Sequence, residues 1–317
     1  MLSIILTLLS LIFISCNQRQ GNKQQNSLVN DEGGSTVIDN YGREITIKNI
    51  PGKILTLGPN CSELFVALGL TECIAGNTLD NHSRGALTEY QDAYDTIPEL
   101  NYGSATREAV ISSGADFIYG IDWEFGEEGL DIHELSDYGI ITYVNSASTM
   151  AEIYQEITDL GKIFQIEDRA AALIASQEDR IKAINKIVAD AAPVKVLVYD
   201  SGGEGVFTCG GNNFETLLIE MAGGKNIFDD ILDKQWTTVS YEEVLKREPD
   251  VILIHDYDAP SLEDKIKAIK NEPALSQLKC VKEERFVAIA LESVLPGIRM
   301  AYAVEVLSEG FHPGLFQ

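Results

Sequence analysis

The chain has 317 residues, of which 45% are hydrophobic and 23% are charged. This composition is ordinary for a globular protein, and the length allows two domains with substantial cores. Because 49 acidic residues outnumber 24 basic ones, the formal net charge is -25, which argues against a partner such as DNA or RNA.

The N-terminal segment is typical of an exported lipoprotein. Its first fifteen residues are apolar, are too few for an ordinary transmembrane helix and end at Cys16. Residues 13–16 resemble a bacterial lipobox, and a short membrane anchor is the alternative. The polar segment 17–35 lacks core-forming residues, which indicates a flexible tether. We predict a signal peptide over residues 1–16 and a lipid on Cys16 that holds the protein to the outer face of the cytoplasmic membrane.

Three short patterns begin the folded part of the chain. Residues 37–47 alternate apolar and polar side chains around an Asn-Tyr-Gly turn, which predicts a β-hairpin. Residues 54–57 are an apolar run typical of a buried strand. The apolar stretch after this strand predicts a short helix, which Ser62 or Asn60 caps and Gly69 ends.

The chain is organised around one long predicted helix, residues 167–190. This stretch contains no Gly or Pro, is rich in Ala and repeats apolar residues near a period of 3.6. At 1.5 Å per residue it would be roughly 36 Å long, about the width of a small domain. Strand, turn and helix patterns precede and follow it, and residues 108–120 resemble residues 242–256. We therefore predict an α/β protein with two lobes, each with a central, mostly parallel sheet. The predicted segments are an N-terminal lobe 36–166, a backbone helix 167–192 and a C-terminal lobe 193–317.

Ordered landmarks from residue 37 to residue 316 resemble the helical-backbone (class III) family of periplasmic binding proteins. They are the hairpin pattern, KILTLGPNCSELFVALG, ADFIYG, the long helix, FETLLIEMAGGKNIFDD, WTTVSYEEVLKREPDVILIHD and PGIRMAYAVEVLSEGFHPGLF. The resemblance implies two lobes joined by a single helix, with a ligand cleft between them. It also implies the monomeric substrate-binding lipoprotein of an ABC importer, which delivers ferric siderophores, haem or cobalamin to permease subunits. The permease subunits and, through them, the ATPase are the expected partners.

The sequence contains no motif for catalysis. It has no GxSxG, HExxH or GxxxxGK[ST] pattern, which favours a carrier over an enzyme or an adhesion module built on the same fold. The four histidines are scattered one per region, so we predict neither a metal site nor a catalytic cofactor. Four cysteines follow Cys16 without metal-binding spacing, and we interpret them as buried free thiols, with one disulfide as the alternative. They are Cys61, Cys73, Cys209 and Cys280.

Four aromatic residues are the main candidates for ligand contacts. The resemblance places them at strand ends that wall the cleft, and the alternative is that they belong to the core. Aromatic faces bind large planar ligands through burial and stacking, worth ~0.5–1.5 kcal/mol beyond area per pair. The Gly-rich segment 202–211 is interpreted as a turn in the cleft wall, because Glu204 would repel the anion that a phosphate loop binds. The four candidates are Tyr102, Trp123, Phe207 and Trp236.

Two polar residues complete the predicted ligand site. The resemblance implies that Arg299, in LPGIRM, is a cation at the cleft margin, where a guanidinium suits carboxylate or catecholate oxygens. A salt bridge to a nearby acid is the alternative. Asn60, in the turn after the first buried strand, is a further candidate. Because Arg299 suits an anionic chelate, we expect a ferric siderophore as the ligand, with a corrinoid second and haem third.

Docking on the permease is expected to use one exposed glutamate on each lobe. The resemblance implies arginines on the membrane subunits as their partners, and the matching positions here are Glu108 and Glu220. Carboxylates on both lobes would give a footprint of complementary charge. Favourable placement in the first turn of a helix is the alternative explanation for Glu108.

Overall fold

The predicted hairpin opens the described part of the chain. The computed structural model describes residues 35–316, so the predicted signal peptide, Cys16 and all of the predicted tether except Ser35 lie outside the described residues. Strands β1 (Thr36–Asn40) and β2 (Arg43–Ile47) pair antiparallel, and Tyr41 and Gly42 between them both adopt positive φ angles. A turn with two positive φ angles matches the twist of the strands, which is why the Asn-Tyr-Gly pattern is informative.

The N-terminal lobe is built on a five-stranded parallel sheet of order β5-β4-β3-β6-β7. Its strands are short, and the central strands β3 and β6 are mainly apolar and buried on both faces, as parallel strands usually are. The elements are β3 (Ile54–Leu57), α1 (Pro59–Ala67), β4 (Ile74–Thr78), α2 (Gln91–Tyr94), β5 (Glu99–Asn101), α3 (Arg107–Ser113), β6 (Phe117–Ile121), α4 (Ile132–Asp137), β7 (Ile141–Asn145) and α5 (Met150–Phe164).

Helix α1 begins earlier than its sequence suggested. Gly58, at φ 125°, is the residue before the helix, and Pro59 occupies the first turn. Ser62 and Asn60 are therefore inside the helix and do not cap it. Proline is favoured in a first turn because its missing N–H would have no partner there. Gly69 follows the helix at φ 70°, as predicted.

The C-terminal lobe combines two sheets. Strands β11-β8-β13-β14 form a parallel sheet, and β12-β10-β9 form an antiparallel one. The elements are β8 (Val194–Tyr199), β9 (Ser201–Gly202), β10 (Val206–Cys209), α7 (Phe214–Met221), β11 (Gly224–Asn226), β12 (Trp236–Val239), α8 (Tyr241–Arg247), β13 (Val251–Asp256), α9 (Leu262–Asn271), α10 (Lys279–Lys282), β14 (Phe286–Ala290) and α11 (Met300–Phe311).

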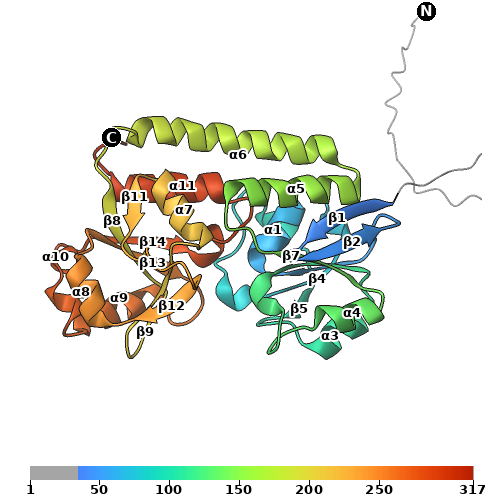
Figure 1. Cartoon of the computed structure of the whole chain (residues 1–317), viewed down its shortest axis with the longest axis horizontal. Helices are drawn as coiled ribbons and strands as arrows, with labels where there is room; N and C mark the ends of the chain where they lie inside the picture. The colour runs from blue at the N-terminus through green and yellow to red at the C-terminus, as the bar shows by residue number, and fades with distance from the viewer. Residues whose placement is uncertain (1–34, 317) are drawn as a thin grey trace, which may run out of the picture. The chain divides into compact units, whose positions relative to one another are not determined.

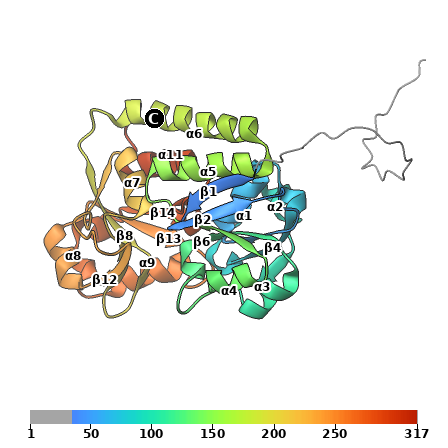
Figure 2. The ribbon, with the colours of Figure 1, turned by 45° about the vertical axis from the view of Figure 1, so that its right-hand side comes forward.

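A single long helix, α6 (Glu167–Val188), connects the two lobes. It packs on α5 of the first lobe and on α11 of the second, so these three helices form a layer above both sheets (Figures 1 and 2). The α/β fold class with two lobes, predicted from sequence, is confirmed. Among the described residues, no helix combines the length and the apolar character needed to cross a membrane.

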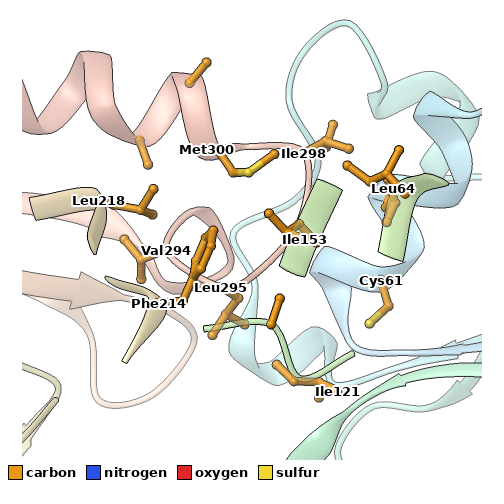
Figure 3. Packing of buried hydrophobic residues seen from close by; sticks show 14 of the residues in the cluster. Cys61, Leu64, Ile121, Ile153, Phe214, Leu218, Val294, Leu295, Ile298 and Met300 are labelled. Carbon is orange, nitrogen blue, oxygen red and sulfur yellow. The ribbon is translucent and has the colours of Figure 1, made fainter. Parts of the chain in front are cut away.

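The largest hydrophobic core continues from one lobe into the other. Leu64 and Ile153 of the first lobe and Leu218 of the second belong to the same buried cluster, together with the segment that leads into α11 (Figure 3). The cysteines of the described chain are free thiols. Cys61, Cys209 and Cys280 are buried, as predicted, whereas Cys73 is only half-buried.

Candidate functional site: a cleft between the lobes

Two adjoining cavities lie where the strands of both lobes end. Residues that follow β6 and β7 meet residues from the start of α7 and β12 around the first cavity, of about 290 Å³. Residues that follow β4, β8, β13 and β14 line the second, of about 400 Å³. In α/β folds the carboxyl ends of parallel strands are the usual place for ligands, because the loops there converge. The two cavities together define the candidate cleft.

Both tryptophans of the chain line both cavities. Trp123 lies directly after β6 and is 40% exposed, which is unusual for so large an apolar side chain. Trp236 is half-buried in β12 and stacks on Phe207 of β10, with ring centroids 5.7 Å apart and an interplanar angle of 21°. Phe207 also lines the second cavity. The structure thus brings three of the four predicted aromatic residues together.

The Gly-rich segment 202–211 is not a simple turn. Its residues include the end of β9 and all of β10, and β10 pairs with β12 in a register that sets Cys209 opposite Trp236. A side chain added at Gly205 would lie 2.3 Å from the carbonyl oxygen of Val239. Glycine here lets two strands approach closely, and this pairing is what holds Trp236 in the cleft wall.

Tyr102 has a different position from the other aromatic candidates. It does not contribute to either cavity, its side chain is exposed, and its hydroxyl donates a hydrogen bond to Asp258 of the other lobe at 2.7 Å. Arg84 and Asp256 form a second contact between the lobes, with N and O atoms 3.3 Å apart. Tyr102 is thus part of a polar contact across the two lobes.

Arg299 is not placed at the surface of the cleft, which corrects the expectation from its motif. Its side chain is 6% exposed and forms ion pairs with two buried carboxylates, those of Glu63 and Glu292. It also donates to Ser293 Oγ at 3.1 Å and to the carbonyl oxygen of Gly85 at 2.6 Å. With its donors committed to these acceptors, the guanidinium has no free edge for a ligand. The environment of Arg299 therefore matches the alternative interpretation, a salt bridge to nearby acids.

Asn60 lies behind the cleft wall. Its side-chain amide is buried and donates to Asn145 Oδ1 at 3.0 Å and to the carbonyl oxygen of Pro296 at 2.8 Å. Asn145 and Pro296 both line the first cavity. Asn60 therefore positions two segments of the wall, one from β7 and one from the segment before α11.

Sequence reasoning missed six residues of the second cavity, and the three of them that carry a ring or a charge are His82, Asp200 and Tyr257. Asp200 follows β8 and Tyr257 follows β13, so the rule that ligands gather at strand ends could have found them. His82 belongs to the loop of residues 79–90, and its ring centroid lies 5.7 Å from that of Tyr257 in the other lobe. No local pattern marked this loop as part of the site.

A buried ionic cluster supports the second cavity. His255 Nδ1 lies 3.1 Å from Asp200 Oδ1, and His255 Nε2 lies 2.9 Å from Glu215 Oε1. Burial alone would lower the pKa of His255, but the two carboxylates raise it to about 9. Burial also opposes ionisation of Asp200, yet hydrogen bonding and charge from His255 hold its pKa below the usual range. At neutral pH this cluster contains an imidazolium and an ionised Asp200.

The predicted docking residues lie on different sides of the molecule. Glu108 is exposed in the first turn of α3, and Glu220 is exposed in the last turn of α7. Helix α7 packs on α11, close to α6, whereas α3 lies away from α6 (Figures 1 and 2). Glu242, exposed in the first turn of α8, occupies the place in the second lobe that Glu108 occupies in the first. Each of these two helices precedes a central strand of its sheet, β6 or β13.

The chain is similar to known proteins in sequence and in fold. The chain is 25% identical to YvrC of Bacillus subtilis, an uncharacterised ABC transporter substrate-binding lipoprotein. The alignment spans 287 residues and covers 89% of this chain and 87% of YvrC. It is 24% identical over 205 residues to a vitamin B12-binding protein of Photorhabdus laumondii, covering 64% of this chain and 70% of that protein. A periplasmic binding protein from Veillonella parvula, 24% identical, superposes with a TM-score of 0.79 over 88% of this chain and 98% of its own.

The family assignment rests on most of the chain. Residues 54–290, from the first strand of the N-terminal sheet to the last strand of the C-terminal sheet, match the family model described as periplasmic binding protein. This range contains both parallel sheets and the long helix between them, and the family resemblance noted in the sequence is confirmed. The chain belongs to the family of periplasmic binding proteins.

Proposed function

We propose that the chain is the extracytoplasmic substrate-binding component of an ABC importer and that it captures a metal chelate between its lobes. The family assignment and the cleft at the strand ends support this proposal. The relative YvrC, which is named as an ABC transporter substrate-binding lipoprotein, supports it as well. The captured molecule is cargo, and the role is binding, not catalysis. The importer's permease subunits and, through them, its ATPase are the proposed partners.

The charge of the cleft wall restricts the class of chelate. Within residues 35–316, no lysine or arginine lines either cavity, and the lining residues that can ionise are Asp122, Asp200 and His82. An anionic chelate would need a cation to offset its desolvation, and burial of Arg299 in an ion-pair cluster removes the one that the sequence suggested. This observation carries the proposal that the ligand has no net negative charge. Corrinoids and hydroxamate-type ferric siderophores meet this condition, whereas ferric catecholates and haem do not.

The experiment compares chelates that differ in charge. Isothermal titration of the protein with cyanocobalamin, a neutral ferric trihydroxamate, a ferric catecholate and haem should give saturable binding for one of the first two and none for the last two. Trp123→Ala should weaken that binding about thirtyfold, since a truncated aromatic contact in a buried site costs ~2 kcal/mol. Tight binding of the catecholate or of haem would refute the proposed ligand class.

The proposed anchor is the lipid on Cys16, which lies outside the described residues. Cys16→Ala should move the protein from the membrane fraction to the soluble fraction or the medium, while the control variant Cys73→Ser should stay with the membrane. Equal membrane retention of the Cys16→Ala variant would show that another segment holds the protein.

A further inference from the structure

The second cavity has the composition of an aromatic cage. Five of its lining residues carry aromatic rings, and the two lobes both contribute to them. Trp123 and Phe207 are 40% and 36% exposed, so parts of their rings are open to a ligand. The cage residues are His82, Trp123, Phe207, Trp236 and Tyr257, with the carboxylate of Asp200 as the acidic member of the wall.

The electrostatic character of this cavity favours a cation. The faces of aromatic rings carry partial negative charge, and they attract ammonium groups most strongly when water is excluded. Asp200 lies at the wall with its carboxylate fixed by His255 and by the hydroxyl of Tyr257, at 3.1 Å each. The buried cluster behind it sets two carboxylates, Asp200 and Glu215, against one imidazole, which can carry at most one positive charge.

The protein itself already uses one of these rings to hold a cation. Lys265 Nζ lies 3.4 Å from the ring centroid of Tyr257 and donates a hydrogen bond to the carbonyl oxygen of His255 at 2.8 Å. Its ammonium group can balance the one negative charge that the imidazolium of His255 leaves in the cluster. Lys265 is buried and does not line the cavity, so a ligand there would meet the rings and Asp200. The rings of Trp123 and Phe207 have no such internal cation among the described residues, whereas the His255 ring lies edge-on to Trp236 with ring centroids 5.8 Å apart.

We propose that the cavity formed by His82, Trp123, Asp200, Phe207, Trp236 and Tyr257 is a subsite for a positively charged organic group of the substituted-ammonium class. This inference rests on the proposed function, because the group would belong to the chelate that the cleft captures. It narrows that class to ligands with a cationic substituent or to complexes that bind together with a small organic cation.

The test uses a cation and a neutral molecule of the same shape. Choline and 3,3-dimethylbutan-1-ol differ in one atom, the charged nitrogen that a carbon replaces. Because both tryptophans of the chain line both cavities, fluorescence of the full chain reports binding anywhere in the cleft, and the Asp200 variant below assigns the response to this cavity. We expect a saturable change in fluorescence with choline and at least tenfold weaker binding of the alcohol. A desolvated cation–π contact changes the affinity by about tenfold or more.

Two variants test the role of the carboxylate. Asp200→Asn should abolish most of the preference for choline, whereas Asp233→Asn, which removes a charge from an exposed residue of the same lobe outside both cavities, should keep it. Because Asp200 supports His255, thermal unfolding must confirm that the Asp200→Asn variant is folded. Trp123→Leu, read by calorimetry, provides a second variant at an exposed position and should weaken choline about tenfold.

The outcomes separate this inference from the proposed function. Equal affinity for choline and the alcohol, or no binding of either, would overturn the cationic subsite. Capture of a neutral chelate would still stand in that case, because it is measured with cyanocobalamin and the ferric trihydroxamate. A saturable choline response that depends on Asp200 and Trp123 would support the subsite.

A further titration, with choline and chelate together, distinguishes the two sources of the cation. Competition indicates a group carried on the chelate, and mutual enhancement indicates a separate small cation.

Discussion

At the scale of single residues, Arg299 is predicted to stabilise the fold. Its partners Glu63 and Glu292 have side chains that are 1% and 0% exposed, so removing the guanidinium leaves two carboxylates uncompensated in the interior. Breaking a buried ion pair by deleting one partner commonly costs ~3–5 kcal/mol. Arg299→Ala should lower the free energy of unfolding in urea by about that amount.

A second arginine provides the control for this prediction. Arg180 pairs with Glu305 at 2.7 Å, but both side chains are about one-third exposed. Solvent screens such a pair, and Arg180→Ala should cost no more than ~1 kcal/mol. If Arg299→Ala is as stable as the wild-type protein but loses its ligand, the original assignment of Arg299 to the ligand site is correct.

Glu156 is predicted to make stability depend on pH. Burial raises its pKa to about 7, despite hydrogen bonds from Asn145 and Tyr119. An acid whose pKa is higher in the folded state keeps its proton on folding, so its contribution is present below the unfolded pKa near 4.5 and is lost as pH rises to about 7. Between these values the unfolding free energy should fall by up to ~1.4 kcal/mol per pH unit.

Removing the ionisable group should flatten this pH dependence. Glu156→Gln should reduce the fall between pH 4.5 and 7 measured by urea unfolding, because Gln does not titrate. Glu178→Gln, at an exposed position of α6, should leave the profile unchanged. A Glu156→Gln profile that parallels the wild type would show that folding does not shift the pKa of Glu156.

At the scale of elements, residue spacing correctly predicted those elements whose conformation depends mainly on residues close together in the sequence. The hairpin and the long helix were found from residue spacing alone, because turn geometry and a 3.6-residue period are local properties. Strand β10, within 202–211, was missed because one of its pairing partners, β12, begins only at Trp236. The burial of Arg299 was missed for the same reason, since Glu63 is 236 residues away in sequence. Trp123 and Trp236, which line both cavities, became candidates through the family resemblance and not through a local pattern.

The placement of α3 and α8 leads to a prediction about docking. Glu108 and Glu242 begin equivalent helices, whereas Glu220 ends a helix that packs on α11. We propose that permease docking uses Glu108 together with Glu242, in place of Glu220. The double variant Glu108→Arg/Glu242→Arg should keep its ligand affinity in solution and fail to support uptake, because reversed charges repel basic loops of the partner.

The matched variant decides between the two pairs. Glu108→Arg/Glu220→Arg carries the same change in net charge and should retain about the uptake of Glu108→Arg alone. If this variant fails as completely as the Glu108/Glu242 pair, Glu220 is part of the docking surface as the sequence first suggested. Full uptake by every variant would place docking elsewhere on the protein.

At the scale of the whole molecule, three features oppose a large movement between the lobes. The lobes share a continuous apolar core (Figure 3), and one uninterrupted helix connects them. The Arg299 cluster also ties Glu63 of α1 to Glu292 of the second lobe. A hinge motion would have to break buried contacts, which are costly, or bend a helix that contains no Pro or Gly. The cleft is therefore expected to be largely formed before the ligand arrives.

Polar contacts between the lobes set how far the cleft opens. Tyr102 with Asp258 and Arg84 with Asp256 are exposed or partly exposed, so they can break at little cost. Small-angle scattering should show only a small decrease in radius of gyration when the ligand binds. Asp256→Ala/Asp258→Ala should raise the ligand-free value slightly and speed ligand release, because the outer contacts are gone while the core remains. A large compaction on binding in the unmodified protein would mean that the shared core separates, and the helix would then have to act as a true hinge.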